Sequence, residues 1–297
     1  MKKQVCFYGS TLSALILLAS GSVYTKIAME YFTAPALTFI RFFFASIFIA
    51  MYLVYKKAPL PKFKDVPYFF LMGASGFALY MCIFNLAIKS VSAATAGFFI
   101  ATSPVITAIM ARVLLKEKIG VLGCVSVFIS FCGIIIITLW NGILSINTGT
   151  LWLVLAVTLF SFYNILQRKI AGHYSPFIAT AYSLVTGTII MLPFLPEAYS
   201  QLIDIPNKYL IISIYLGVFP TGIAYSLWSV ALHMATKTSQ ASNFLFLTPL
   251  ITTLLEVIIL GVLPHASLYI GGILVLAGLV LMGGHSHQSG KKSQAEK

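Results

Sequence analysis

The chain alternates between long apolar runs and short polar segments. Crossing the hydrocarbon core of a bilayer takes about 20 apolar residues in a helix, because each residue rises ~1.5 Å through a core ~30 Å thick. The runs are continuously apolar, without the alternation of strands that face a polar lumen. They predict an all-α integral membrane protein with ten transmembrane helices: Val5–Ala28, Ala34–Val54, Pro67–Ile88, Thr95–Leu115, Ile119–Leu139, Thr150–Leu166, Pro176–Pro196, Tyr209–Leu232, Ser239–Leu260 and Ala266–Met282.

Composition excludes most soluble folds. Of the 297 residues, 59% are hydrophobic and only 9% are charged, whereas a soluble globular protein is about 25% charged. The excess of apolar surface needs lipid to face. The lipid bilayer is therefore the first partner that the sequence predicts.

The basic charge is better explained by membrane topology than by nucleic-acid binding. Lys and Arg number 19 against 7 acidic residues, a net charge of +12. With ten helices, fifteen basic residues fall on the side of the N-terminus, Lys26, Lys89 and Lys208 fall on the other, and Arg41 lies inside a helix. Cytoplasmic loops are enriched in Lys and Arg, so we expect a multi-pass protein of the cytoplasmic (inner) membrane with both termini in the cytoplasm. No basic stretch carries aromatics spaced for base stacking, and no nucleic-acid partner is expected.

Other simple signals add little chemistry. Lys2 and Lys3 before an apolar stretch resemble a signal peptide, but the first run has a repeat partner later in the chain and is interpreted as the first helix. The four cysteines lie in apolar runs without a CxxC pair, and His285 and His287 are isolated in the tail. We therefore predict neither a metal nor a cofactor.

The chain repeats itself after about 145 residues. That shift superimposes Ser103, Pro104 and Thr107 on Thr248, Pro249 and Thr252, and Gly133 on Gly278, while a shift of 144 places Gly73 on Gly217. Because five helices per unit is an odd number, the second unit would enter the membrane from the opposite side, as in many secondary transporters. The predicted units are residues 1–139 and 150–283, joined by an outer linker at 140–149 and followed by a disordered cytoplasmic tail at 284–297.

Two five-helix repeats, Pro104 and Pro249 in matching helices, Arg41 following Pro35, and Glu117 just after the fourth run together resemble the EamA-type branch of the drug/metabolite transporter superfamily. The resemblance covers nearly the whole chain. It implies a carrier fold without naming a cargo, because the family includes exporters of amino acids and of other metabolites. The second repeat has Val262 where the first has Glu117, so any role of that acid is not duplicated.

Polar and aromatic side chains recur on helix faces that share one interior. Amides and hydroxyls are costly in lipid, so they turn toward partners or a wet cavity. Taken singly, each is more simply explained as a tie between helices. Together they predict a cavity suited to an apolar or zwitterionic solute, with these candidate lining residues: Ser20, Tyr24, Tyr80, Asn85, Phe99, Tyr163, Asn164, Tyr225, Trp228 and Asn243.

Five residues are candidates for coupling or gating. Glu256 lies well inside the ninth run and could carry a proton, or serve as a structural carboxyl. Arg41 could attract a carboxylate, although a structural tie to helix ends is the simpler explanation. Glu117 sits among basic residues at the cytoplasmic edge as an ion-pair partner or gate residue. Pro104 and Pro249 remove backbone donors, either as plain kinks or as hinges.

Other classes of protein fit less well. Gly73-Ala74-Ser75-Gly76 matches the Gly-x-Ser-Gly of rhomboid-type intramembrane proteases, but no histidine lies within a membrane run to act as base for Ser75, and small residues for tight packing explain the motif. A channel filter is not evident, and a scaffold would not need the duplication. We therefore predict a non-enzymatic monomer that transports a small-molecule solute, as an exporter or uniporter of amino acids or similar metabolites, with protons as a further candidate partner.

Overall fold

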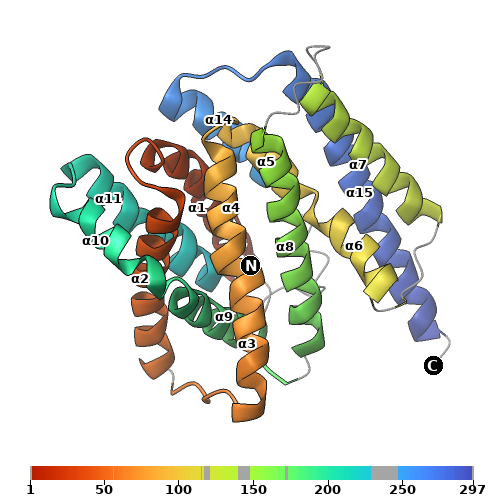
Figure 1. The fold of residues 1–297 in the computed structure, drawn as a ribbon. Coiled ribbons are helices and arrows are strands. Elements are labelled where there is room, and N and C mark those ends of the chain that lie inside the picture. The colour runs from red at the N-terminus through yellow and green to blue at the C-terminus, as the bar shows by residue number, and fades with distance from the viewer. Residues whose placement is uncertain are drawn as a thin grey trace.

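The computed structural model describes residues 2–55, 57–114, 116, 121–139, 148–170, 173–228 and 247–295. The regular elements in these ranges are all helices, packed side by side (Figure 1). The first half of the chain contains α1 (Lys2–Ala28), α2 (Ala34–Tyr55), the 3₁₀ turn η1 (Phe63–Asp65), α3 (Val66–Gly73), the π-helix η2 (Ala74–Ala78), α4 (Leu79–Ile88), α5 (Ala93–Ala101), α6 (Ser103–Leu114) and α7 (Val121–Leu139).

The described part of the second half is also helical. It contains α8 (Thr148–Ile170), α9 (Pro176–Ile190), the 3₁₀ turn η3 (Leu192–Phe194), α10 (Leu195–Ile203), α11 (Asn207–Leu216), the π-helix η4 (Gly217–Ile223), α14 (Thr248–Leu260) and α15 (Ala266–Ala295). Local chemistry sets several ends. Ser92 caps α5 and Ser175 caps α9, because each side-chain oxygen accepts a hydrogen bond from the backbone N–H three residues later. Gly261, in the left-handed region, ends α14.

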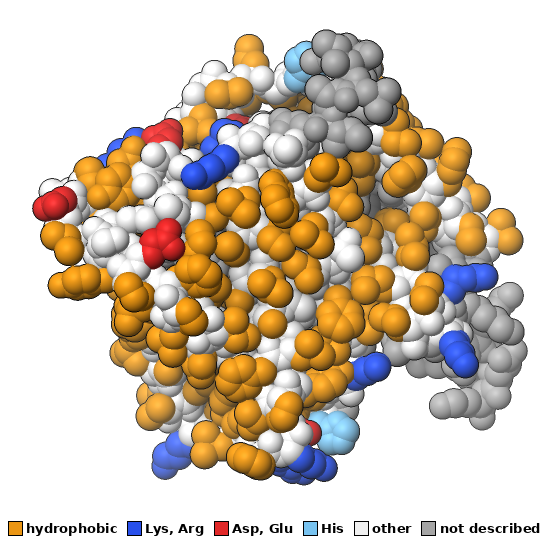
Figure 2. Space-filling model, viewed as in Figure 1, with side chains coloured by type: hydrophobic (Ala, Val, Ile, Leu, Met, Phe, Trp, Pro, Cys, Tyr) orange, Lys and Arg blue, Asp and Glu red, His pale blue; other side chains and the backbone are white. Residues whose placement is uncertain are grey.

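Membrane-spanning length is met by six of the described helices, or by seven if one bent pair counts as a span. Three shorter apolar helices, Val121–Ile137, Thr248–Leu260 and Ala266–Gly278, lie in the fifth, ninth and tenth predicted runs. A space-filling view shows apolar side chains over the middle of the molecule and charged ones mostly around its edges (Figure 2). The described chain is thus an α-helical, multi-pass membrane protein, and the number ten stays a prediction.

Proline breaks two predicted runs. The fourth run is two helices, because Pro104 has no N–H to donate to the carbonyl of Ile100, and the chain turns at Thr102 between α5 and α6. The seventh run bends by 46° at Met191, where Pro193 follows. At the C-terminus, α15 is drawn as helix to Ala295. The disordered tail expected from residue 284 stays a prediction.

The two π-helices occupy matching places in the two halves. Gly73 directly precedes η2, and Gly217, its partner at a shift of 144, opens η4. Both glycines are close-approach points: a Cβ on Gly73 would lie 2.6 Å from the backbone nitrogen of Gly187 on α9, and a Cβ on Gly217 would lie 2.8 Å from the carbonyl oxygen of Arg41 on α2. Each π-helix therefore packs against the second long helix of the other half.

Contacts between the halves come in exchanged pairs. Helix α1 packs on α14 while α8 packs on α6, and α2 packs on η4 while α9 packs on η2. The fifth helices of the two halves, α7 and α15, pack along each other at one side of the molecule (Figure 1). A Cβ on Gly133 would meet the carbonyl oxygen of Gly271 at 2.5 Å, so small residues permit this approach.

Candidate functional site

Hydrogen bonds between the two halves converge on the interior. Ser20 Oγ of α1 lies 2.7 Å from the hydroxyl of Tyr215 on α11, and Ser46 Oγ of α2 lies 2.7 Å from Thr188 Oγ1 on α9. Arg41 Nε of α2 donates to Thr221 Oγ1 of η4 at 2.8 Å. Polar groups buried in a membrane bundle must find such partners inside it. The interface between the halves is therefore where polar chemistry concentrates.

Arg41 is held at that interface by two hydroxyls. It is the eighth residue of α2, about 10 Å from the start of that helix at 1.5 Å per residue, and only 7% exposed. Nε donates to Thr221 Oγ1, and Nη1 donates to Thr25 Oγ1 at 3.3 Å. Each hydroxyl can accept because its own proton is donated within its helix, to Leu216 and Gly21 respectively. The guanidinium thus bridges α1, α2 and η4.

The sequence of η4 explains one of these acceptors. Pro220 lies four residues after Leu216 and cannot donate the hydrogen bond that an α-helix would give to the Leu216 carbonyl. The helix widens there, and Thr221 Oγ1 donates to that carbonyl at 2.9 Å instead. Pro220 therefore sets the position of the oxygen that receives Arg41 Nε.

An aromatic cluster adjoins Arg41. Tyr80 on α4 and Tyr225, which follows η4, both interact electrostatically with the guanidinium. Their rings are in contact with further aromatics: Tyr80 with Phe160 at a centroid distance of 5.0 Å, and Tyr225 with Phe77 at 6.2 Å. Tilted packing of this kind makes a rigid apolar surface. The interior beside Arg41 is thus aromatic, with two tyrosines close enough to interact with its charge.

Several other candidate residues serve as ties between helices. Ser20 is bonded to Tyr215, and the Tyr24 ring packs on the same tyrosine at 4.9 Å. Asn85, fully buried, donates from Nδ2 to Thr38 Oγ1 at 2.9 Å and so joins α4 to α2. Tyr163 lies with its hydroxyl 3.2 Å from Thr180 Oγ1, between α8 and α9.

The remaining lining candidates separate into three groups. Phe99 is 1% exposed and packs in the hydrophobic core. Asn164 and Trp228 are half-buried. Asn243, and with it the gating candidate Glu117, lies outside the described residues. The structure therefore brings Tyr80 and Tyr225 to Arg41, and it places Ser20, Tyr24, Asn85 and Tyr163 in ties between helices.

Glu256 joins the halves at the end of the bundle where α1 ends and α5 begins. Following the orientation expected from the sequence, we call this the outer end. Glu256 is 3% exposed, and its two oxygens accept from the backbone nitrogens of Ala93 and Ala94 at 2.8 and 2.7 Å. These are the unpaired donors at the start of α5, where the helix dipole favours negative charge. Glu256 therefore fastens α14 to the first turn of α5.

Lys26 contributes to the same fastening. Its ammonium, near the end of α1, donates to the carbonyl oxygens of Ile88 and Val91 in the turn between α4 and α5, and it interacts electrostatically with Glu256. The sequence analysis counted Lys26 only as an outer-side charge. Because its partners are backbone carbonyls of a distant turn, no sequence pattern marked this role. The same is true of Tyr215, the partner of Ser20 and Tyr24.

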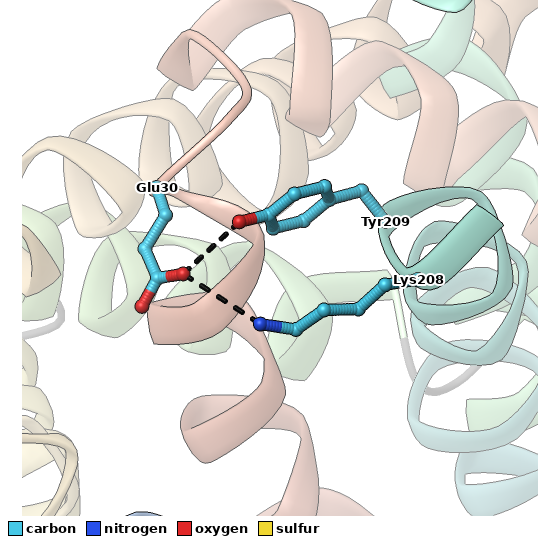
Figure 3. Close-up of polar contacts among 3 residues, drawn as sticks. All are labelled: Glu30, Lys208 and Tyr209. Carbon is cyan, nitrogen blue, oxygen red and sulfur yellow. Dashed lines mark hydrogen bonds and ion pairs between the residues drawn. The ribbon is translucent and has the colours of Figure 1, made fainter. Parts of the chain in front are cut away.

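A second group of contacts joins the halves at the outer end, beside α10 and α11. Glu30, just after α1, accepts from the hydroxyl of Tyr209 at 3.1 Å and pairs with Lys208 at 3.8 Å (Figure 3). Thr33 donates to Glu197 of α10 at 2.6 Å. All these bonds again join residues of different halves.

The two prolines proposed as gating residues lie at the starts of helices. Pro104 is the second residue of α6, and Pro249 is the second residue of α14. Both positions are compatible with proline, because the first N–H groups of a helix have no partner within the helix. The matching placement of the two prolines is observed, and their use as hinges stays a prediction.

Two other kinds of site have no support. Ser75 donates its hydroxyl to the Leu71 carbonyl of its own helix at 2.8 Å and is 3% exposed, as expected of a packing residue. Among the residues that the structure describes, no group of three His, Cys, Asp or Glu side chains is arranged to hold a metal ion.

Comparisons with known proteins give a consistent result. The chain is 28% identical over 258 residues to the uncharacterized transporter YdfC of Bacillus subtilis, covering 86% of this chain and 83% of that protein. It is 25% identical over 258 residues to a protein of Streptantibioticus cattleyicolor named as a probable terminal-alkyne amino-acid exporter, covering 86% of each. An uncharacterized transporter of Archaeoglobus fulgidus is 28% identical over 92% of this chain and 96% of its own length.

A solved crystal structure has the same fold, with a TM-score of 0.61 over 92% of this chain and 94% of that chain at 17% identity. The model of the EamA-like transporter family matches this chain twice, at residues 7–139 and again at residues 147–284. The relatives are named as transporters, so the intramembrane protease alternative is not supported. The two matches together span nearly the whole sequence, and the chain belongs to the EamA-like transporter family.

Proposed function

We propose that this protein is a monomeric secondary transporter of the cytoplasmic membrane that moves small metabolites, such as amino acids, by alternating access, as an exporter or uniporter. The observation that carries the proposal is the exchange of contacts between the halves: α1 on α14 and α8 on α6, α2 on η4 and α9 on η2. If the two units are inverted, exchanging their conformations turns an outward-open state into an inward-open one. A scaffold has no use for such a pairing.

The interior chemistry supports a solute of intermediate polarity. Arg41 and the hydroxyls beside it provide a polar centre, and Phe77, Tyr80 and Phe160 provide an apolar wall. One relative is named for amino-acid export, which suggests the first compounds to try. In this proposal the ties at Glu256 and Lys26 hold the outer end shut, and their release opens the pathway on that side.

The direct test is counterflow of radiolabelled amino acids and other metabolites in proteoliposomes, with and without an imposed pH gradient. We expect saturable counterflow of at least one member of the panel. A gradient effect would show proton coupling, and its absence would show facilitated diffusion. If correctly reconstituted protein shows no counterflow of any compound in the panel, the result would instead favour a non-transporting scaffold.

Two alanine variants connect the activity to the interior. We expect Tyr225→Ala and Trp228→Ala to lower counterflow at least tenfold, because each removes a large ring next to the expected pathway. Tyr199→Ala and Trp152→Ala are matched controls, since these two rings are 65% and 40% exposed on the surface. If the interior variants transport as well as the surface ones at equal expression, the proposed lining is wrong.

A further inference from the structure

The charge of Arg41 has no counter-ion in the described part of the protein. No described carboxylate forms an ion pair with it, and the oxygen atoms that it contacts belong to the neutral hydroxyls of Thr25 and Thr221. A third contact, from Nη1 to the sulfur of Met81 at 3.6 Å, is weak. An ionisable group within a membrane bundle usually pairs with an opposite charge or serves a functional site. The missing counter-ion therefore suggests that Arg41 binds an anion from outside the protein.

The hydrogen-bonding capacity around Arg41 is also unfilled. Its terminal nitrogen Nη2, which points toward Gly21, makes no hydrogen bond with any described residue. The same holds for the hydroxyls of Tyr80 and Tyr225 within the described ranges, although both interact electrostatically with the guanidinium. Arg41 is 7% and Tyr80 is 8% exposed, and Tyr225 is half-buried, so none of the three is fully enclosed. Three helices thus contribute donors that lack an acceptor.

A carboxylate fits this set of donors. Its two oxygens accept several hydrogen bonds at once, and the planar guanidinium matches its geometry better than an ammonium would. The ring of Phe77 packs on Tyr225 and the ring of Phe160 packs on Tyr80, so these rings would contact an apolar body. A cationic solute would be repelled by Arg41, and a sugar would leave the charge without a partner.

Building on the proposed function, we propose that Arg41, Tyr80 and Tyr225 form the site that binds the carboxylate of the transported solute, whose remaining part is apolar or aromatic. The halves then meet at the ligand: Tyr80 and Arg41 come from the first half, and Tyr225 and the Arg41 acceptor Thr221 come from the second. Bound carboxylate would strengthen contact between the halves at the point where they must move.

Matched pairs of probes isolate the carboxylate. Phenylacetate, phenylalanine and leucine are each compared with the corresponding amide, which has the same body without the negative charge of the carboxylate. Binding is measured as ligand-induced thermal stabilisation of the purified protein. We expect each acid to bind about tenfold or more tightly than its amide, the ratio typical of a lost charged hydrogen bond. Equal binding of acids and amides, or no binding of any acid, would overturn the proposal.

Variants then assign the effect to residues. Arg41→Gln should remove the preference for acids over amides, while Arg112→Gln, which removes an exposed arginine of α6, should keep the parent's preference. Tyr80→Phe and Tyr225→Phe remove only a hydroxyl and should each weaken acid binding several-fold without changing amide binding. If Arg41→Gln shows no cooperative melting and so does not fold, these two phenylalanine variants test the carboxylate site in its place. An unchanged acid preference in both phenylalanine variants would exclude the two hydroxyls.

The same proteoliposomes separate this inference from the proposed function. If the protein shows saturable counterflow of amines or neutral solutes that is unaffected by Arg41→Gln, the transporter proposal stands and the carboxylate site is wrong. If acids bind as predicted but no solute shows counterflow, the site stands and the transport proposal fails.

Discussion

At the residue scale, the hydrogen-bond partners of Glu256 show how protonation of this residue would act on the protein. The sequence analysis offered a proton carrier or a structural carboxyl. In the structure both oxygens accept hydrogen bonds from the backbone N–H groups of Ala93 and Ala94. A protonated carboxyl can keep only one of these bonds without placing a hydrogen against an N–H group. Protonation of Glu256 would therefore loosen α14 from α5.

This geometry predicts how Glu256→Gln behaves. The amide nitrogen would face a backbone donor, so one hydrogen bond to a charged acceptor, of about 1.5–3 kcal/mol, is lost. If Glu256 couples protons, counterflow that depends on pH in the parent should become independent of pH in the variant, and gradient-driven uptake should be lost. Glu197→Gln is the control, because it also removes a carboxylate bonded across the halves at the outer end. Counterflow with the parent's rate and pH dependence would exclude Glu256 as the coupling group.

At the element scale, the apolar runs predicted where helices form but not how they are interrupted. Hydropathy averages over a window, so it located α2 or α7 well and was insensitive to a single residue. The break at Thr102 and the wide turns η2 and η4 depend on which carbonyl a missing or displaced N–H leaves free. Contacts between halves are harder still, because Arg41 and Thr221 are 180 residues apart and only the folded pairing shows that they meet.

Helix packing at the α7–α15 pair predicts a local stability effect. In Gly133→Ala the new methyl would lie 2.5 Å from the Gly271 carbonyl oxygen, whereas a methyl at Gly9 on α1 meets nothing within 4 Å. Overpacking costs about 1–3 kcal/mol, while alanine at an open helix position gains about 0.5–1 kcal/mol. We expect Gly133→Ala to lower the melting temperature and Gly9→Ala to keep or raise it. Equal melting temperatures would mean that α7 and α15 can separate at little cost.

At the scale of the whole molecule, the proposed mechanism depends on the two halves facing opposite ways. Lys64 and Lys208 are the sharpest pair for testing this, because they are both exposed, are related by a shift of 144, and lie at the starts of corresponding segments, η1 and α11. In an inverted duplication, equivalent residues lie on opposite sides of the membrane. The distribution of basic residues predicts that Lys64 lies in the cytoplasm and Lys208 outside.

Single cysteines at these two positions decide the orientation. In a background whose four native cysteines are replaced by serine, a membrane-impermeant maleimide should label Lys208→Cys in intact cells and Lys64→Cys only after the membrane is opened. The reverse pattern would keep the inversion but turn the protein over, placing the Glu256 fastening at the cytoplasmic end. Labelling of both positions from the same side would mean parallel halves. An exchange of conformations between the halves could then no longer alternate access, although membership of the EamA-like family would stand.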